Sequence, residues 1–126
     1  MGGNRQSIVR QLRKQYKVVI AQSGVSDVEN KKRYIIETFK YRSYAENFSR
    51  QIKKAAQQLD TLPCAYGTTG FRYRGYDIYM KPQSNHLLFY TVNEETQTVT
   101  VLRVLQDGMD WEYILEQWIK QNSLVE

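Results

Sequence analysis

The sequence predicts an α+β fold with the element order β-α-α-β-β-β-α. In the first half of the chain, two stretches with apolar residues at helical spacing follow one short β-rich run. The second half holds three β-rich stretches joined by short links, and a further helical stretch follows them. Because short links favour antiparallel pairing, we expect a small antiparallel-type sheet made of one N-terminal strand plus a three-stranded meander.

The composition is that of one globular domain. The chain has 126 residues, of which 41% are hydrophobic and 25% are charged. Its first residues are basic and polar, so we expect a basic N-terminal arm over residues 1–15 and a single domain over residues 16–126.

Several classes of protein are disfavoured by what the sequence contains. Its single cysteine, Cys64, cannot form an internal disulfide, and no cluster of cysteine and histidine could hold zinc. No stretch approaches the ~20 apolar residues of a membrane span, and the basic start lacks the apolar run of a secretory signal. We therefore expect a cytoplasmic protein without metal, cofactor or membrane association.

The first strand and the first helix are expected in succession. Tyr16–Ile20 is a short β-rich run and predicts the first strand. Gly24 then interrupts the chain before a helix start. Ser26 followed by Glu29 fits a capping box, in which each side chain satisfies a free backbone amide at the helix end.

A second helix follows at once. Ser43 with Glu46 fits another capping box, and Pro63 stops the apolar stripe behind it, because proline cannot continue a helix. Two helices joined by so short a link should form an antiparallel hairpin.

The second half reads as strands and a last helix. The segments Phe71–Lys81, His86–Asn93 and Thr98–Gln106 predict the meander, with Gly75 as a bulge or bend in the first of them. Asp110 should cap the last helix. Its apolar residues recur at intervals of three and four, so they share one face: Trp111, Ile114, Leu115 and Trp118.

Charge is divided unevenly along the chain. Residues 1–54 carry 13 Lys and Arg against 4 Asp and Glu, whereas residues 55–126 carry 5 against 9. A basic half of this strength commonly meets phosphates or an acidic protein. A pair of well-solvated helices would carry the same charges, so both interpretations stay open.

The second half resembles a known family of toxins. The residues that carry the resemblance are Gly75-Tyr76, Leu87-Leu88-Phe89-Tyr90, Glu94-Glu95, Val101-Leu102-Arg103-Val104-Leu105 and Asp110-Trp111. In this order they are similar to the C-terminal half of the RelE/ParE superfamily, the toxins of bacterial type II toxin–antitoxin pairs. The resemblance extends from about Tyr16 to Leu115, and over the first half it is one of pattern only.

This resemblance implies a curved sheet with the helical hairpin packed on one face. It also implies that the chain inhibits growth and is silenced by a cognate antitoxin that wraps it. In the RelE branch the other, concave face of the sheet cuts mRNA in the ribosomal decoding site. In the ParE branch the toxin poisons DNA gyrase instead.

The sequence departs from the nuclease branch at three places. Where many members have His-Gly-Arg-Arg, this chain has Gln106-Asp107-Gly108-Met109. Leu87 stands where nuclease members often have arginine, and the lysine pair expected on the preceding strand is reduced to Lys81.

Four residues could still supply metal-free RNA cleavage, which needs a general base, a general acid and cations at the phosphate. Arg72 and Arg74, two apart on one expected strand, should point to one face and bind the phosphate. Arg103 could add a cation, contact an acidic antitoxin segment together with that pair, or pair with a carboxylate at the sheet rim. His86, the one histidine, suits proton transfer near neutral pH but could equally be a solvated residue at a strand start.

Substrate contacts are expected from Lys53, Lys54, Lys81 and Tyr90. The lysines would meet phosphates, and Tyr90 would stack on a base unless it packs in the core.

Three functions follow from these observations. The first is inhibition of translation by ribosome-dependent mRNA cleavage, which the basic hairpin and the paired arginines favour. In that case the chain is a metal-independent endoribonuclease whose partners are the ribosome and mRNA. The second is inhibition of DNA gyrase, which needs no general acid or base and therefore suits the departures. The third is a non-enzymatic RNA- or protein-binding module on the same scaffold.

Overall fold

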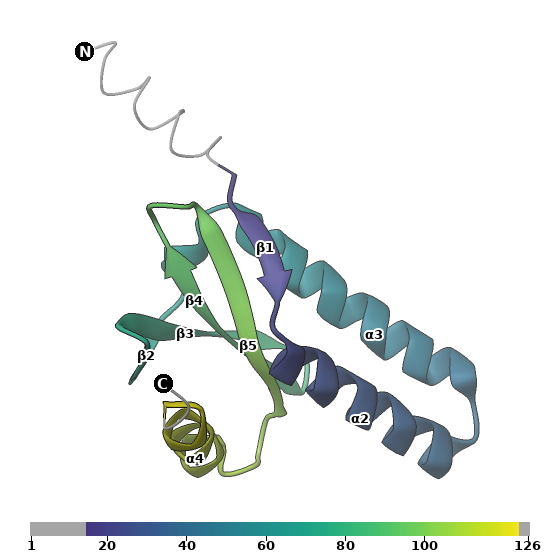
Figure 1. Ribbon diagram of the computed structural model, residues 1–126. Coiled ribbons are helices and arrows are strands. Elements are labelled where there is room, and N and C mark those ends of the chain that lie inside the picture. Colours follow the sequence, from purple (N-terminus) through teal and green to yellow (C-terminus); the bar gives the residue numbers. More distant parts are fainter. Residues whose placement is uncertain (1–14, 124–126) are drawn as a thin grey trace.

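The computed structural model describes residues 15–123 of the chain, so the expected basic arm lies almost wholly outside the described residues. Strands and helices follow one another in the predicted order, with one strand more than expected (Figure 1). The elements are β1 (Lys17–Ile20), α2 (Gln22–Phe39), α3 (Arg42–Gln57), η1 (Gln58–Asp60), η2 (Pro63–Ala65), β2 (Thr68–Tyr73), β3 (Tyr76–Gln83), β4 (His86–Asn93), β5 (Thr98–Gln106) and α4 (Trp111–Ser123).

The strands form one five-stranded sheet in the order β1-β5-β4-β3-β2. Strands β2 to β5 are an antiparallel meander, and β1 lies parallel to β5 at the edge. The structure thus confirms the α+β class, the N-terminal strand and the meander.

The extra strand arises at Gly75. Sequence pattern predicts one strand over Phe71–Lys81 with a bulge or bend, but the chain reverses there and forms the β2–β3 hairpin. Arg74 and Gly75 have φ angles of 52° and 87°. Positive φ at both central residues is typical of the tight turns that join antiparallel strands. The bulge interpretation is therefore wrong.

Both capping boxes are also wrong. Helix α2 begins at Gln22, so Ser26 lies inside it, and α3 begins at Arg42, one residue before Ser43; neither helix has a side-chain cap. Tertiary bonds fix the start of α2 instead. The Ala21 amide donates to the Val101 carbonyl at 2.9 Å and the Ser23 hydroxyl donates to the Leu102 carbonyl at 2.6 Å.

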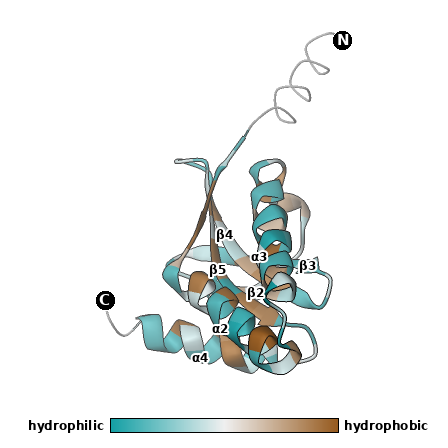
Figure 2. Ribbon diagram, turned by 90° about the vertical axis from the view of Figure 1, so that its right-hand side faces the viewer, coloured by the Kyte–Doolittle hydropathy of each residue, from teal (hydrophilic) through white to brown (hydrophobic). Residues whose placement is uncertain are grey.

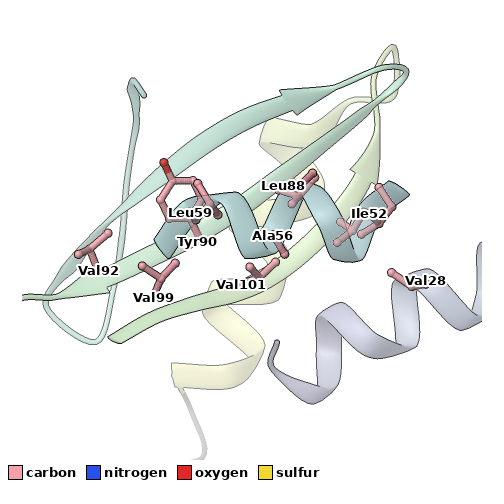
Figure 3. Close-up of a cluster of buried hydrophobic side chains, with 11 residues drawn as sticks. Val28, Ile52, Ala56, Leu59, Leu88, Tyr90, Val92, Val99 and Val101 are labelled. Carbon is pink, nitrogen blue, oxygen red and sulfur yellow. The ribbon is translucent and has the colours of Figure 1, made fainter. Parts of the chain in front are cut away.

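The helical hairpin packs on one face of the sheet, as the resemblance implies. The apolar side chains between them form a first buried cluster, which joins α2 and α3 to β4 and β5 (Figure 3). Its buried residues are Val28, Ile52, Ala55, Ala56, Leu59, Leu88, Tyr90, Val92, Val99, Val101 and Val104. The outward faces of the helices are mainly hydrophilic, whereas the central strands carry hydrophobic residues (Figure 2). None of the helices within residues 15–123 is long and apolar enough to cross a membrane.

Helix α4 covers the opposite face. The second cluster contains Ile78, Leu87, Phe89, Leu102, Leu105 and Leu115, with Phe71, Tyr73, Trp111 and Trp118 packed against it. The predicted cap is present, because the Tyr113 amide donates to the Asp110 carboxylate at 3.3 Å. The molecule therefore has three layers: the hairpin, the sheet and α4.

Candidate functional site

A cavity of about 580 Å³ lies beside the part of β5 that β1 does not cover. Helices α2 and α3, the start of β4, the end of β5 and the first turn of α4 all contribute to its wall. The wall includes Asp27, Lys31, Phe48, His86, Arg103 and Met109. Two of the four candidate catalytic residues, His86 and Arg103, thus line one cavity.

An ion pair builds one side of this cavity. Strand β1 ends at Ile20, opposite Val101. Beyond this point β5 is an edge strand, and the Val104 amide has no carbonyl of β1 to donate to. The Asp27 carboxylate takes this place and accepts the Val104 amide at 2.9 Å. It also accepts two bonds from the Arg103 guanidinium, at 2.7 and 2.9 Å.

The pair settles one of the alternatives for Arg103. The side chains of Arg103 and Asp27 are only 16% and 14% exposed. The carboxylate neutralises the guanidinium and occupies two of its five N–H donors, so Arg103 attracts a phosphate less than an unpaired arginine would. Arg103 is therefore paired with a carboxylate at the sheet rim.

His86 forms another part of the wall. Its ring packs 4.8 Å from that of Phe48, and its Nε2 atom is buried with no hydrogen-bond partner among residues 15–123. Burial, together with the positive charge of Lys31, lowers the pKa of His86 below its ordinary value of 6.5. The imidazole is therefore neutral at pH 7, a state that can accept a proton but cannot serve as a cationic acid.

Arg72 and Arg74 lie elsewhere. Arg74 sits in the β2–β3 turn with its guanidinium 5.1 Å from the Tyr73 ring, while Arg72 bonds the Gly75 carbonyl and pairs with Asp77 at 3.3 Å. The expectation that both arginines share one face of a strand is wrong, because Arg72 lies on β2 whereas Arg74 lies in the turn.

The turn that carries Arg74 and the residue His86 lie at opposite ends of β3. The turn adjoins Tyr76 at one end of β3, whereas His86 is paired with Gln83 at the other. At ~3.3 Å per residue, β3 separates these ends by roughly 23 Å. Arg72 and Arg74 therefore do not meet His86 and Arg103 in one site.

Two of the expected substrate contacts are interior. Lys81 is 5% exposed, and its ammonium donates to the Ala55 carbonyl at 2.8 Å and to Gln58 at 3.0 Å. Tyr90 is fully buried and donates to the Pro63 carbonyl at 2.6 Å. In these positions Lys81 closes the end of α3 and Tyr90 anchors the loop that follows it.

The other two expected contacts are at the surface. Lys53 and Lys54 are both exposed on α3. Lys54 lines a smaller hollow together with Gln58 and Gln83. These two lysines remain available to a charged partner.

Asp27 and Lys31 belong to the cavity and were not predicted. Asp27 stands 76 residues from Arg103, so no local pattern connects them. The one usable signal was Arg103 itself, a charge in an apolar row that needs a carboxylate. Residues 1–54 offer four acidic side chains, and only the fold selects Asp27. Within residues 15–123, no group of three or more His, Cys, Asp or Glu is placed to hold a metal ion.

Comparison with known proteins gives one family. The family model described as ParE toxin of type II toxin-antitoxin system, parDE, matches residues 18–111. No curated protein matches the sequence.

Two solved structures have a similar fold. The chromosomal ParDE system of P. aeruginosa has a TM-score of 0.62 at 8% identity, covering 75% of this chain and 99% of the other. The toxin–antitoxin complex RelBE2 of Mycobacterium tuberculosis has a TM-score of 0.51 at 18% identity, covering 75% of this chain and 93% of the other.

Proposed function

The chain belongs to the ParE toxin family of type II toxin–antitoxin systems, and from this membership we propose that it arrests bacterial growth by binding and poisoning DNA gyrase. A cognate antitoxin would hold it inactive. Poisoning of this kind is an act of binding, so it requires no general acid or base on the toxin.

The position of α4 carries the proposal. A nuclease of this superfamily would use the sheet face opposite the helical hairpin. Here that face is filled with apolar side chains from α4, chiefly Trp111, Leu115 and Trp118. Apolar side chains cannot stabilise the charged phosphate of a cleaved strand.

The scattered candidates support the same conclusion. The arginines at the β2–β3 turn lie at the far end of the sheet from His86, and Arg103 is held by Asp27. Cleavage needs these groups within hydrogen-bond reach of one phosphate. Binding to a large partner makes no such demand.

One observation favours a second mechanism. His86 is neutral, its Nε2 has no partner among residues 15–123, and it lines an open cavity, as a general base would. Ribosome-dependent mRNA cleavage is therefore the competing function. His86→Gln tests it, because loss of a general base typically costs ~10²–10⁴-fold in rate.

The experiment is induction of this chain in growing bacteria, with a copy carrying an early stop codon as control. Pulses of labelled thymidine and labelled amino acid should show that DNA synthesis falls first, and gyrase-linked DNA breaks should accumulate. His86→Gln should arrest growth as well as the unaltered chain. Co-expression of the cognate antitoxin should restore growth.

Two results would contradict the proposal. Early loss of protein synthesis with discrete cuts in a test mRNA, abolished by His86→Gln, would establish cleavage instead. A folded, well-expressed chain that leaves growth unchanged would leave only a binding module.

A further inference from the structure

Three aromatic side chains stand exposed at the closed end of the helical hairpin. Phe39 ends α2, Tyr41 lies in the link, and Tyr44 is in the first turn of α3; their exposed fractions are 51%, 61% and 54%. The rings contact one another, with centroids 6.0 Å apart for Phe39 and Tyr44 and 5.3 Å for Tyr41 and Tyr44. We call this group the aromatic tip.

The aromatic tip makes no contribution to the core. None of its rings belongs to either apolar cluster of residues 15–123. The end of the hairpin that carries it projects away from the sheet (Figure 1). Exposed apolar rings that contact one another are typical of an interaction site, because water favours their burial.

The backbone holds the tip in place. Only Lys40 and Tyr41 separate the two helices. Lys40 adopts φ 65°, and its amide donates to the Ile36 carbonyl at 2.8 Å, which closes α2. The three rings are therefore presented on a fixed turn between two packed helices rather than on a long loop.

Basic residues predominate along the hairpin that carries the rings, and two of them, Lys40 and Arg42, adjoin the rings in the sequence. Between residues 31 and 54 the hairpin carries eight basic side chains and two acidic ones, Glu37 and Glu46. The basic residues are Lys31, Lys32, Arg33, Lys40, Arg42, Arg50, Lys53 and Lys54. Within residues 15–123, neither Lys40 nor Arg42, the two cations at the tip itself, has a carboxylate at ion-pair distance.

The combination favours a partner that carries both flat apolar groups and negative charge. An acidic peptide would satisfy the cations but leave the ring faces in water. An apolar protein surface would cover the rings but desolvate the cations without pairing them, which is costly. A nucleotide offers both a base that stacks on a ring and a phosphate that pairs with a cation.

We propose that the aromatic tip binds single-stranded nucleic acid, with bases stacked on Tyr41 and Tyr44 and phosphates held by Lys40 and Arg42. A duplex hides its base faces inside the stack, so the rings can act only where bases are unpaired. This contact is additional to gyrase binding and does not depend on the identity of the toxin's target.

Titration of a short fluorescein-labelled oligothymidine with the full chain, followed by fluorescence anisotropy, tests the proposal. Tyr41→Ala and Tyr44→Ala should each weaken binding by about fivefold or more, because each removes one stacked base. The matched control is Tyr113→Ala, which removes an equally exposed tyrosine from α4 and should leave affinity unchanged.

Salt dependence tests the cations separately. Lys40→Gln and Arg42→Gln should each reduce the slope of log affinity against log salt by ~0.7, the value for one phosphate of a single strand. Lys120→Gln, an exposed lysine on α4, is the control.

Two results would overturn the proposal. The first is that the tip variants bind the oligonucleotide as tightly as Tyr113→Ala does. The second is that a duplex of the same length binds equally well and is insensitive to Tyr41→Ala. If the tip variants instead lose affinity only for purified gyrase or antitoxin, the tip is a protein contact and the proposal fails. Because the titration contains neither gyrase nor growing cells, its failure leaves the proposed function standing.

Discussion

Asp27 is the residue on which the bonds at the sheet edge converge. It accepts two bonds from Arg103 and one from the Val104 amide. Asp27→Ala would leave a largely buried guanidinium and an edge amide without partners. We expect a loss of about 2–4 kcal/mol of unfolding free energy, measured by chemical denaturation.

The control for Asp27 is the exposed pair of α4. Glu116 lies 3.4 Å from Lys120, and the two side chains are 48% and 63% exposed. Because exposed pairs contribute little, Glu116→Ala should cost less than ~0.5 kcal/mol. Equal losses for the two variants would mean that Asp27 is no more than a solvated carboxylate.

His86 should make the stability of the protein depend on pH. The pKa of His86 is lowered in the folded state, whereas in the unfolded chain it has its ordinary value of 6.5. As the pH falls through 6.5, the unfolded chain therefore binds the proton more readily than the folded protein does. The unfolding free energy should therefore be unaffected by this group above about pH 7.5 and fall as the pH drops through ~6.5. His86→Phe should remove this part of the pH dependence.

The histidine signal makes this prediction direct to check. His86 is the one histidine of the sequence, so its ring protons can be followed by NMR without assignment. A titration midpoint above 6.5 in the folded protein would contradict the prediction that burial of the His86 ring lowers its pKa.

Individual site residues could be proposed from sequence, but their neighbours could not. Arg103 and His86 stood out by type, one as a charge in an apolar row and the other as the one histidine. Their surroundings come from segments far apart in the chain, such as Asp27 and Phe48. Pairing over such separations is decided by how the helical hairpin lies on the sheet.

Gly24 sets the distance between α2 and the sheet. A Cβ atom there would lie 3.0 Å from Ile20 Cγ2 and 3.2 Å from the Val101 carbonyl oxygen. Gly24→Ala would gain ~1 kcal/mol of helix propensity but force the helix off β5, and such overpacking costs ~1–3 kcal/mol. Because one of the two contacts is backbone, we expect the cost to prevail.

Gly67 is the matched control for this substitution. Its added Cβ would meet nothing within 4 Å, and its φ lies outside the left-handed range. Gly67→Ala should leave the melting temperature unchanged or slightly raised, whereas Gly24→Ala should lower it. A stabilising Gly24→Ala would show that α2 can move without cost.

Elements were predictable where one local signal decides them and not where tertiary contacts do. The strands β4 and β5 follow their apolar pattern, so their predicted bounds are correct. Hydrogen bonds from Ala21 and Ser23 to β5 fix the start of α2, so the helix begins before Ser26, the residue that the capping pattern indicates. The turn at Arg74-Gly75 lacks the Asn or Asp that usually precedes glycine in such turns, so the sequence pattern alone indicates a bulge there.

The three layers of the molecule depend on both faces of one sheet. Alternate residues of β4 serve different layers: Leu88 and Tyr90 face the hairpin, while Leu87 and Phe89 face α4. Loss of either covering layer would expose the apolar side chains of the central strands. We therefore expect the hairpin, sheet and α4 to unfold together.

The tryptophans allow this expectation to be tested. Both Trp111 and Trp118 lie on α4, and the sequence has no others, so tryptophan emission reports on this helix alone. Far-ultraviolet circular dichroism reports on all the helices and the sheet. In a cooperative molecule the two signals should change at the same denaturant concentration.

Leu115→Ala should shift both signals together. Leu115 is fully buried on the inner face of α4. Its truncation removes apolar contacts and leaves a cavity, which should lower the unfolding free energy by about 2–5 kcal/mol. Tyr113→Ala, on the exposed side of the same helix, should leave both midpoints in place. If the tryptophan signal of Leu115→Ala changes well before the circular dichroism, α4 detaches on its own. The sheet face beneath it would then open without unfolding, and the argument against a nuclease surface there would fail.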